Sequence, residues 1–334
     1  MYGLAIGDAL GMPTEMLSRA QIMTRWGSLL TGFEPAPPGH SIAAGLPAGA
    51  ITDDTEQAVL LGRLLVKGRG TVDPRELAEA LVSWERDMAA RGSLALLGPS
   101  TKRAVAAIRA GIPPEEAGAR GATNGAAMRI APVGIAVNLD LPGPAAFPGQ
   151  AVRPALSALV DRVEAASRVT HNTGLALAGA AAVAASVSAG VSGADVGEAM
   201  AFAVDAAGIA AGRGHWVAGA DVAARIEWAT GLVAGLDLAA AADVIYTLVG
   251  TSLATQESVP AAFAVLAAVP ASPWQACLLA ASLGGDCDTI AAMAGAVAGA
   301  CHGIEAFPRE AIAAIDAHGL DLASLADDLA ALRR

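Results

Sequence analysis

Apolar residues recur three and four positions apart along most of this chain, which is the spacing of one face of an α-helix. The segments PRELAEALVSWERDMAA (74–90) and GEAMAFAVDAAGIAA (197–211) both show it. No alternation typical of a β-strand continues for more than a few residues. Hydrophobic residues make up 54% of the 334 residues and aromatic residues only 4%. Because alanine is the strongest helix former, we predict an all-α protein with a small-residue core.

The predicted helices lie between loops rich in Gly and Pro, and their ends are defined to within about 2–4 residues. Residues 32–50 and 138–150 are expected to be long loops. A single domain spanning 1–334 is favoured, because the two acidic segments described below are most useful if they meet. The predicted helices are 53–68, 74–90, 99–110, 149–168, 171–189, 193–210, 219–234, 237–248, 255–267, 273–283, 288–303, 307–316 and 320–333.

Charge and cysteine content narrow the classes of protein. The net charge is −11, which opposes long-range attraction to nucleic acid, so we expect no nucleic-acid partner. Three cysteines without a CxxC pair make a disulfide framework or a structural zinc site improbable. No basic region followed by an apolar signal core begins the chain, and we expect a cytoplasmic protein.

Residues 173–193 carry no charge over 21 positions. A segment of this length raises the question of a membrane span. It is rich in Ala and Gly rather than in Leu and Ile, and no cluster of Lys and Arg flanks it. We therefore expect a buried helix of a helical bundle and no membrane partner.

Two acidic pairs stand directly before apolar helices. The first is TDDT (52–55), and the second is GGDCDT (284–289). An Asp or Thr at such a position is ordinarily an N-cap that satisfies free backbone N–H groups. One cap explains one Asp, however, and each segment holds two.

The surplus carboxylates indicate a metal site. Divalent cations such as Mg²⁺ prefer oxygen ligands. Asp286 and Asp288 point to opposite sides of a regular helix, so the first must lie on the loop, where Gly284 and Gly285 give the backbone freedom to turn. If the two helix starts face each other, four carboxylates and two Thr hydroxyls surround one cavity, and two divalent cations would neutralise them.

These segments also carry a resemblance to a known family. GLAIGDALGMPTE, TDDT, TNGAAMRIAPVG, VTH and GGDCDTIAAMAGAVAG together resemble the ADP-ribosylglycohydrolase family, in the family's order and over nearly the whole chain. The resemblance implies an orthogonal multi-helix bundle with two Mg²⁺, or Mn²⁺, in a central cleft. It implies the metal ligands Thr52, Asp53, Asp54, Asp286, Asp288 and Thr289, and it implies catalytic roles for Glu15, Asp53 and Asp288.

Further segments match parts of the family that contact substrate. Asn124 and Gly125 match a Gly-Asn-Gly loop, in which Thr123 stands where many members have Gly; a plain Asn-Gly turn is the alternative. His171 matches a histidine near the ligand, although a lone histidine is more often structural. Gly98 and Ser100 are weaker candidates, since an ordinary N-capped surface helix would carry the same residues.

Two other features have competing interpretations. Cys287 lies between two proposed ligands, and we favour a packing role because alternate residues point away from the metals. His215 and Trp216 are candidates for stacking on an adenine, with surface packing as the alternative. Aromatic residues are scarce otherwise.

The resemblance implies hydrolysis of the glycosidic bond at the anomeric carbon of an ADP-ribosyl group, on a protein or a small molecule. A related metal-dependent N-glycosidase acting on a smaller riboside or nucleoside is the first alternative. A pseudoenzyme that only binds ADP-ribose is the second. A diphosphate enzyme of the isoprenoid synthase type is disfavoured, because five Phe and two Tyr are poor material for an aromatic cavity. We expect a monomer.

Overall fold

The computed structural model describes residues 1–92, 97–139 and 153–333, and these residues are mainly helical. Over these ranges the extended pairing is limited to two isolated bridges, Thr123 with Ala254 and Thr173 with His215. The all-α prediction is confirmed. The α-helices are α1 Tyr2–Gly11, α2 Arg19–Trp26, α3 Asp53–Lys67, α4 Pro74–Ala90, α5 Pro99–Arg109, α6 Pro114–Ala117, α7 Ala131–Ala136, α8 Arg153–Ser167, α9 Gly174–Val191, α10 Val196–Ala210, α11 Val222–Val233, α12 Leu238–Val244, α13 Thr255–Ala268, α14 Pro273–Ala281, α15 Cys287–His302, α16 Arg309–Asp316 and α17 Leu322–Ala331.

Short turns of tighter or wider helix join several of these elements. A π-helical turn, Ile245–Val249, continues α12. The 3₁₀ turns are η1 Met12–Thr14, η3 Asn124–Ala126 and η5 Ile304–Ala306. Of these, η1 and η3 matter most, because each leads directly into a segment of the candidate site.

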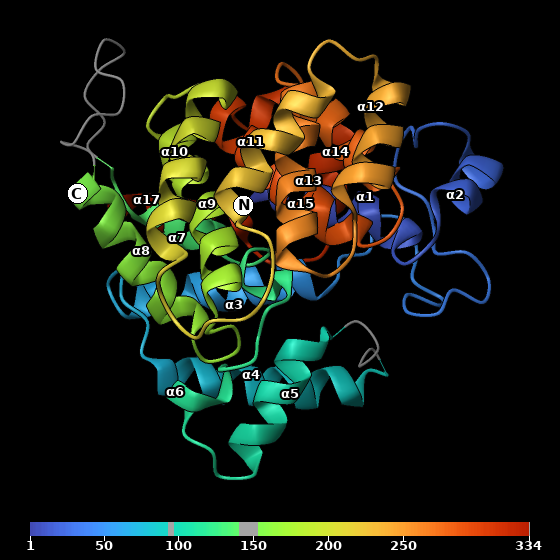
Figure 1. Cartoon of the computed structure of the whole chain (residues 1–334). Coiled ribbons are helices and arrows are strands. Elements are labelled where there is room, and N and C mark those ends of the chain that lie inside the picture. Colours follow the sequence, from blue (N-terminus) through green and yellow to red (C-terminus); the bar gives the residue numbers. More distant parts are fainter. Residues whose placement is uncertain (93–96, 140–152, 334) are drawn as a thin grey trace.

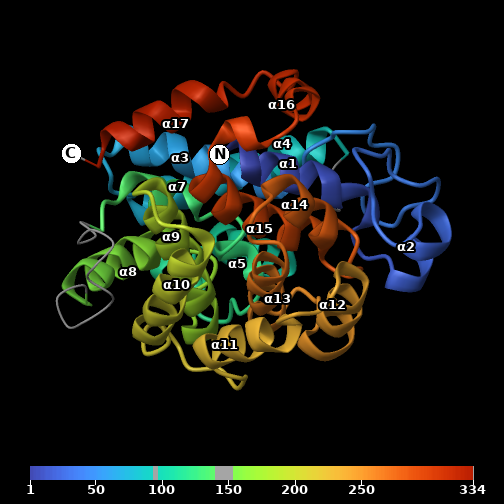
Figure 2. The same ribbon diagram turned by 90° about the horizontal axis from the view of Figure 1, so that it is seen from above.

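Helices α1 and α15 pack against each other in the middle of the molecule (Figures 1 and 2). Around them lie α9, α13 and α14. The two central helices come from opposite ends of the sequence, as their blue and red colours show. The fold therefore brings the start of the chain against the residues that follow Asp286.

Three glycines at a spacing of four form the face of α1 that meets α15. A Cβ atom at Gly3 would lie 2.1 Å from the carbonyl oxygen of Gly295, and one at Gly7 would lie 2.0 Å from that of Ala291. A Cβ at Gly11 would lie 2.3 Å from the Cα of Asp288. These distances are far below van der Waals contact, so the two backbones touch only because side chains are missing here.

Helix α9 is the uncharged segment noted in the sequence. Judged by length and mean hydropathy (1.8 over 18 residues) it could cross a membrane, but 89% of it is buried within the protein. Its Ala and Gly residues pack against α7, α8, α10 and α15. The expectation of a buried core helix is confirmed by this packing.

Helices α4, α5 and α6 contact one another and form a layer beneath the main body in Figure 1. Most predicted helices appear within a few residues of the expected ranges, although 149–152 and most of the loop 138–150 lie outside the described residues. Four helices, α1, α2, α6 and α7, were not predicted. In α1 three glycines lower the helix propensity, and α6 and α7 are short and contain proline.

Candidate functional site

The two acidic helix starts meet. Thr289, in the first turn of α15, donates from Oγ1 to Oδ2 of Asp54, in the first turn of α3, at 3.3 Å across 235 residues of sequence. Between them lies a narrow cavity of about 30 Å³. It is lined by Glu15, Asp53, Asp54, Gly98, Pro99, Thr101, Thr123, Asn124, Gly125, Met128, Leu253, Asp286, Asp288 and Thr289.

The start of α3 is fixed from outside the helix. Thr52 is its N-cap and accepts from the backbone N–H of Asp54 at 3.3 Å. Asp8 of α1, which is fully buried, accepts from the backbone N–H of Thr52 at 3.0 Å and from that of Thr55 at 3.1 Å. It also accepts from the Thr55 hydroxyl at 2.5 Å. A carboxylate outside the helix thus satisfies donors that Thr52 alone would leave free.

Asp8 is a residue that the sequence reasoning missed as part of the site. The sequence does contain a pattern that could have identified Asp8, because it is the single carboxylate within the apolar segment GLAIGDALG. A buried charge in such surroundings requires hydrogen-bond partners. The partners come from α3, which cannot be identified without the fold.

The start of α15 is held by a turn that only glycines adopt easily. Gly284 and Gly285 have φ angles of +97° and +78°. The backbone N–H of Asp286 donates to the carbonyl of Thr251 at 2.7 Å. Asp286 occupies the N-cap position and Asp288 the first turn of α15. The expected division, one aspartate before the helix and one within it, is the arrangement observed.

Glu15, directly after η1, completes a compact group of carboxylates. Oxygen atoms of Glu15, Asp286 and Asp288 all lie within 4.8 Å of one another, and the three residues are buried. Asp53 and Asp54 line the same cavity from the opposite side. Five of the described carboxylates therefore face one small space.

Because these carboxylates are buried and close together, their negatively charged forms are destabilised. Burial, followed by the charges of Asp8 and other neighbours, raises the pKa of Asp53 and of Asp54 well above its usual range. Burial and then the charge of Glu15 do the same for the pKa of Asp288. Burial raises the pKa of Asp286 to about 6, although a hydrogen bond from Asn124 opposes it. Without cations the cluster would retain protons near neutral pH.

The residues present fit divalent cations. Glu15 Oε2, Asp54 Oδ1 and Asp288 Oδ1 are buried, and none of them has a hydrogen-bond partner among the described residues. Buried carboxylate oxygens without partners are rare unless something else binds them. All the donors are oxygen atoms of carboxylates and hydroxyls, which hard cations such as Mg²⁺ and Mn²⁺ prefer. The acidic cavity can therefore hold metal.

The loop at η3 contacts the acidic residues directly. The side-chain amide of Asn124 donates to Oδ2 of Asp286 at 2.5 Å and to the Ser258 hydroxyl at 2.9 Å. Gly125 lies over the ring of His171, where a Cβ atom would be 2.8 Å from Cε1. The glycine therefore allows the loop to rest on the histidine.

The sequence-based candidates for ligand contact divide into two groups. Gly98, Asn124 and Gly125 line the cavity. Ser100 and His171 are buried behind it, since Ser100 bonds to the Thr123 hydroxyl at 2.9 Å and His171 Nε2 lies 3.0 Å from the same hydroxyl. Burial, followed by the charge of Arg129, lowers the pKa of His171 well below its usual value, which makes the ring neutral. Thr52 likewise caps α3 without lining the cavity.

Cys287 is buried, and its Sγ accepts from the backbone N–H of Gly284 at 3.0 Å. Burial raises the pKa of its thiol to about 12, as a packing role requires. Trp216, on the loop between α10 and α11, is 87% exposed. The neighbouring His215 donates its backbone N–H to the carbonyl of Asn172, so this loop is tied to the residue after His171.

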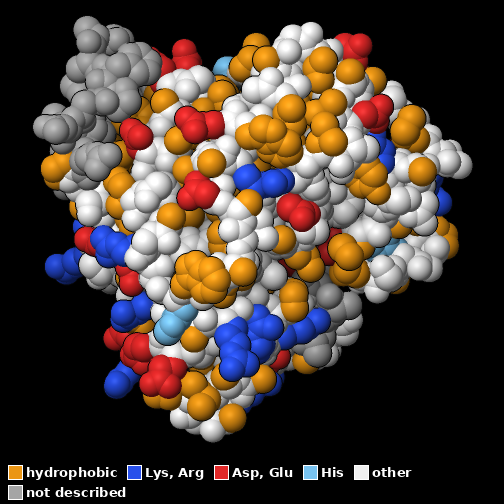
Figure 3. All heavy atoms as spheres, in the orientation of Figure 1, with side chains coloured by type: hydrophobic (Ala, Val, Ile, Leu, Met, Phe, Trp, Pro, Cys, Tyr) orange, Lys and Arg blue, Asp and Glu red, His pale blue; other side chains and the backbone are white. Residues whose placement is uncertain are grey.

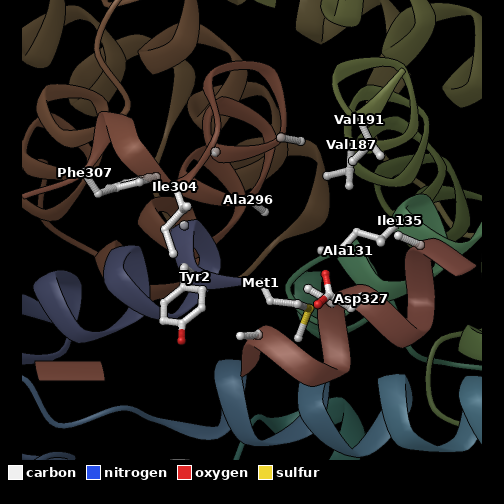
Figure 4. Close-up of a pocket in the computed structure, with 16 residues that line it drawn as sticks. Met1, Tyr2, Ala131, Ile135, Val187, Val191, Ala296, Ile304, Phe307 and Asp327 are labelled. Carbon is white, nitrogen blue, oxygen red and sulfur yellow. The ribbon is translucent and has the colours of Figure 1, made fainter. Parts of the chain in front are cut away.

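A larger cavity of about 420 Å³ lies at the other end of α1 and α15 (Figure 4). Tyr2, Ile304 and Phe307 line one part of it and Val187 and Val191 another, and Asp327 projects from α17. Its walls are mainly apolar. The acidic cavity, with its group of unpartnered carboxylate oxygens, is the stronger candidate for the functional site.

Comparison with known proteins agrees with this site. The family model for ADP-ribosylglycohydrolase matches residues 1–334. The chain is 34% identical to the Escherichia coli (strain K12) protein YegU, itself uncharacterized, over 100% of this chain and 96% of YegU. It is 37% identical to the ADP-ribosyl-[dinitrogen reductase] glycohydrolase of Rhodospirillum rubrum over 25% of this chain and 26% of that protein.

A solved structure agrees with these matches. An ADP-ribosylglycohydrolase-related protein complex superposes with a TM-score of 0.68 and 25% identity, covering 99% of this chain and 95% of that one. The family model spans the acidic helix starts and the η3 loop. The chain therefore belongs to the ADP-ribosylglycohydrolase family, a family of hydrolases.

Proposed function

We propose that the protein is a Mg²⁺-dependent hydrolase that cleaves the glycosidic bond at the anomeric carbon of an ADP-ribosyl group. The observation that supports this most is the set of five buried carboxylates around one narrow cavity, three of them with an unpartnered oxygen atom. In this proposal residues 1–334 act as one domain. Both acidic helix starts are needed for one site.

In the proposed mechanism Asp53, Asp54, Asp286, Asp288 and Thr289 would hold two divalent cations from the cavity wall. Thr52 does not line the cavity, but its hydroxyl lies 3.4 Å from Oδ2 of Asp54 and would join them as a ligand. Bound cations of this kind orient ribose hydroxyls and lower the pKa of a bound water. Glu15 carries a raised pKa, because it is buried and close to Asp286 and Asp53. A carboxylate with a raised pKa is suited to accept a proton from the attacking water at neutral pH. That proton then passes to the leaving group as the bond to the anomeric carbon breaks.

The size of the cavity suggests how a ligand lies. A space of about 30 Å³ holds ions and the reacting atoms rather than a whole dinucleotide. The remainder of an ADP-ribosyl group would extend over the rim. In Figure 3, Lys and Arg side chains gather over α5, and Lys102 and Arg103 directly follow the cavity residue Thr101. A basic surface there suits a diphosphate, in a chain whose net charge is −11.

A panel of ribosides tests the proposal. ADP-ribosylated arginine, ADP-ribosylated serine, O-acetyl-ADP-ribose and free nucleosides are each incubated with Mg²⁺ or Mn²⁺. We expect hydrolysis of at least one ADP-ribosyl compound, abolished by EDTA and by Asp288→Asn. Asp205→Asn serves as the matched control, because Asp205 is exposed on α10 and does not line the cavity.

Three outcomes would count against it. Hydrolysis that persists in metal-free buffer would rule out the metal-dependent mechanism. Preference for a free nucleoside would favour a smaller riboside as substrate. Tight binding of ADP-ribose without turnover of any linkage would instead support a pseudoenzyme. Glu15→Gln separates chemistry from binding, since we expect kcat to fall by about 100-fold or more while ADP-ribose still binds.

A further inference from the structure

Arg129 is a buried cation beside the acidic cavity. It follows η3, and only 1% of its surface is exposed. Burial lowers the pKa of its guanidinium to about 10, while the nearby charge of Asp53 opposes this shift, so the side chain remains charged at neutral pH. A buried guanidinium is costly unless its donors are used. Its two terminal nitrogens each donate a hydrogen bond, one toward Asp53 and the other toward Thr123, whereas Nε has no partner among the described residues.

One terminal nitrogen of Arg129 starts a chain of hydrogen bonds, here called the first arm, that leads to the proposed metal ligand Asp53. Arg129 donates from one terminal nitrogen to Oε1 of Gln57 at 2.7 Å. Because the amide oxygen of Gln57 is thus engaged, its amide nitrogen is turned the other way, and it donates to Oδ2 of Asp53 at 3.0 Å. Gln57 is fully buried in α3. Arg129 therefore determines that the amide nitrogen of Gln57, and not its oxygen, points at Asp53.

The other terminal nitrogen starts the second arm, a chain of hydrogen bonds that leads to Thr123, the residue before η3. Arg129 donates from its other terminal nitrogen to Oγ1 of Thr170 at 2.5 Å. Thr170 Oγ1 lies 2.7 Å from Nδ1 of His171, whereas its other acceptor, the Ser167 carbonyl, is 3.5 Å away. His171 Nε2 in turn lies 3.0 Å from the hydroxyl of Thr123, which lines the cavity.

Donor and acceptor roles in this arm follow from chemistry. A guanidinium only donates, so Thr170 Oγ1 accepts from it. Thr123 Oγ1 donates to Ser100 Oγ and therefore accepts from His171 Nε2, which leaves Nδ1 of the neutral ring to accept the proton of Thr170 Oγ1. A neutral imidazole with an accepting Nδ1 carries its proton on Nε2. His171 therefore donates to Thr123 and fixes that hydroxyl at the cavity wall.

We propose that Arg129 is a positioning residue that holds Asp53 on the metal side and Thr123 on the ligand side in one hydrogen-bonded frame. Arg129 itself does not line the acidic cavity. The guanidinium fork sets two acceptors in a fixed geometry, which a flexible ammonium does not do. This inference rests on the proposed function only for the identity of the ligand, because the two arms are defined by the protein alone.

Single-arm variants test the frame. Gln57→Leu cuts the first arm, Thr170→Val cuts the second, and Arg129→Met cuts both. Thr230→Val is the matched control, because the Thr230 hydroxyl bonds only within α11, to the Ile226 and Glu227 carbonyls. Three quantities are measured: the affinity for Mn²⁺ alone, the side-chain ¹⁵N resonances of His171 in the metal-free protein, and the affinity for ADP-ribose with Mg²⁺. The His171 resonances are assigned by their loss in His171→Gln.

We expect the variants of the two arms to change different measured quantities. Gln57→Leu should weaken Mn²⁺ binding by about 10-fold, the effect of one hydrogen bond to a charged group, and leave the His171 resonances unchanged. Thr170→Val should move the Nδ1 resonance downfield and weaken ADP-ribose by about 5-fold, with Mn²⁺ affinity unchanged. Arg129→Met should show both effects. If Arg129→Met does not fold, Arg129→Lys takes its place, and both readouts should again shift.

The proposal is overturned if wild-type His171 carries its proton on Nδ1 or titrates between pH 5 and 8. It is also overturned if the Arg129 variants alter one arm only, or if all variants merely lose stability with unchanged Mn²⁺ affinity and ¹⁵N resonances. Failure of the wild type to bind ADP-ribose would instead contradict the proposed function, since the Mn²⁺ and ¹⁵N readouts still decide whether the frame exists.

Discussion

Gly11 and Asp288 meet backbone to backbone, since a Cβ atom on Gly11 would stand 2.3 Å from the Cα of Asp288. The position of a proposed metal ligand is thus determined by a residue that has no side chain. Any displacement of α15 along α1 would carry Asp288 with it. Rigid support of this kind is what a site with closely spaced ligands requires.

Gly11→Ala should therefore damage both stability and the site. Overpacking in a buried contact costs about 1–3 kcal/mol, and backbone atoms of Asp288 have nowhere to retreat. We expect a lower Tm and at least 10-fold weaker Mn²⁺ binding, measured by thermal unfolding and isothermal titration. Gly208→Ala is the control, because it lies in α10 with nothing near its Cβ position. Equal effects of the two substitutions would contradict the close contact.

Asp8→Asn should loosen the start of α3. Asp8 accepts two backbone N–H groups and a hydroxyl, and an amide replaces one acceptor oxygen with a competing donor. Leaving a buried donor unsatisfied costs about 1–3 kcal/mol, so Tm should fall by several degrees. Mn²⁺ affinity should fall as well, because Thr52, Asp53 and Asp54 follow the movement of the helix. A variant with wild-type Mn²⁺ affinity would show that Asp8 does not position these residues.

The stability of the metal-free protein should decrease as pH rises. Burial raises the pKa of Asp8 and of Asp286 to about 6, and it raises that of Asp54 well above the usual range. In the unfolded chain these groups titrate near about 4. The folded state therefore binds protons more tightly, and this contribution, fully present below about pH 4, is lost as pH rises through about 6 and above. We expect Tm in EDTA to fall between pH 5 and pH 8.

Divalent cations should reverse this loss. Mg²⁺ that binds only the folded state at 100 times its Kd adds about 2.7 kcal/mol of stability. The gain in Tm on adding Mg²⁺ should be larger at pH 8 than at pH 5, because protons compete for the same oxygens. Asp54→Asn should reduce both the pH dependence and the Mg²⁺ effect. A Tm in EDTA that rises steadily from pH 5 to pH 8 would contradict the buried, repulsive cluster.

Trp216→Ala should weaken the binding of ligands that carry a base and leave the binding of ligands without a base unchanged. The indole is largely exposed on a loop tied to Asn172, and stacking on a base is worth about 1–3 kcal/mol. We expect ADP-ribose to bind about 10-fold more weakly, while ribose 5-phosphate and Tm are unaffected. Trp228→Ala, which removes a partly exposed indole from α11, is the matched control. An equal loss for both ligands would place the effect elsewhere than at the base.

The sequence predicted the parts of the site that are local. Asp286 before α15 and Asp288 within it followed from the glycine pair and from helical periodicity, and the structure has this arrangement. The helical class followed from spacing and alanine content. The carboxylate surplus at TDDT and GGDCDT also led to the prediction that the two helix starts face each other, and in the structure they do; the metal site inferred from the same surplus stays a prediction.

What escaped prediction depends on contacts between distant segments. Helix α1 was missed because its glycines, unfavourable in an isolated helix, are favourable only against α15. Asp8 was not assigned because its donors lie in α3. Arg129 stood within a quoted motif, yet its partners Gln57 and Thr170 come from two other segments. His171 was expected at the ligand, but the fold places it one layer behind, under Gly125.

The pairing of α1 with α15 also determines when the acidic cavity can form during synthesis of the chain. Helix α1 is synthesised long before its partner, because α1 begins at Tyr2 and α15 begins about 285 residues later, at Cys287. Until then its glycine face remains uncovered, and Glu15 has neither Asp286 nor Asp288 beside it. Contacts so distant in sequence form late and slow folding. A truncated chain that ends before α15 should therefore lack the acidic cavity and be prone to aggregate, which makes synthesis of α15 the step that creates the site.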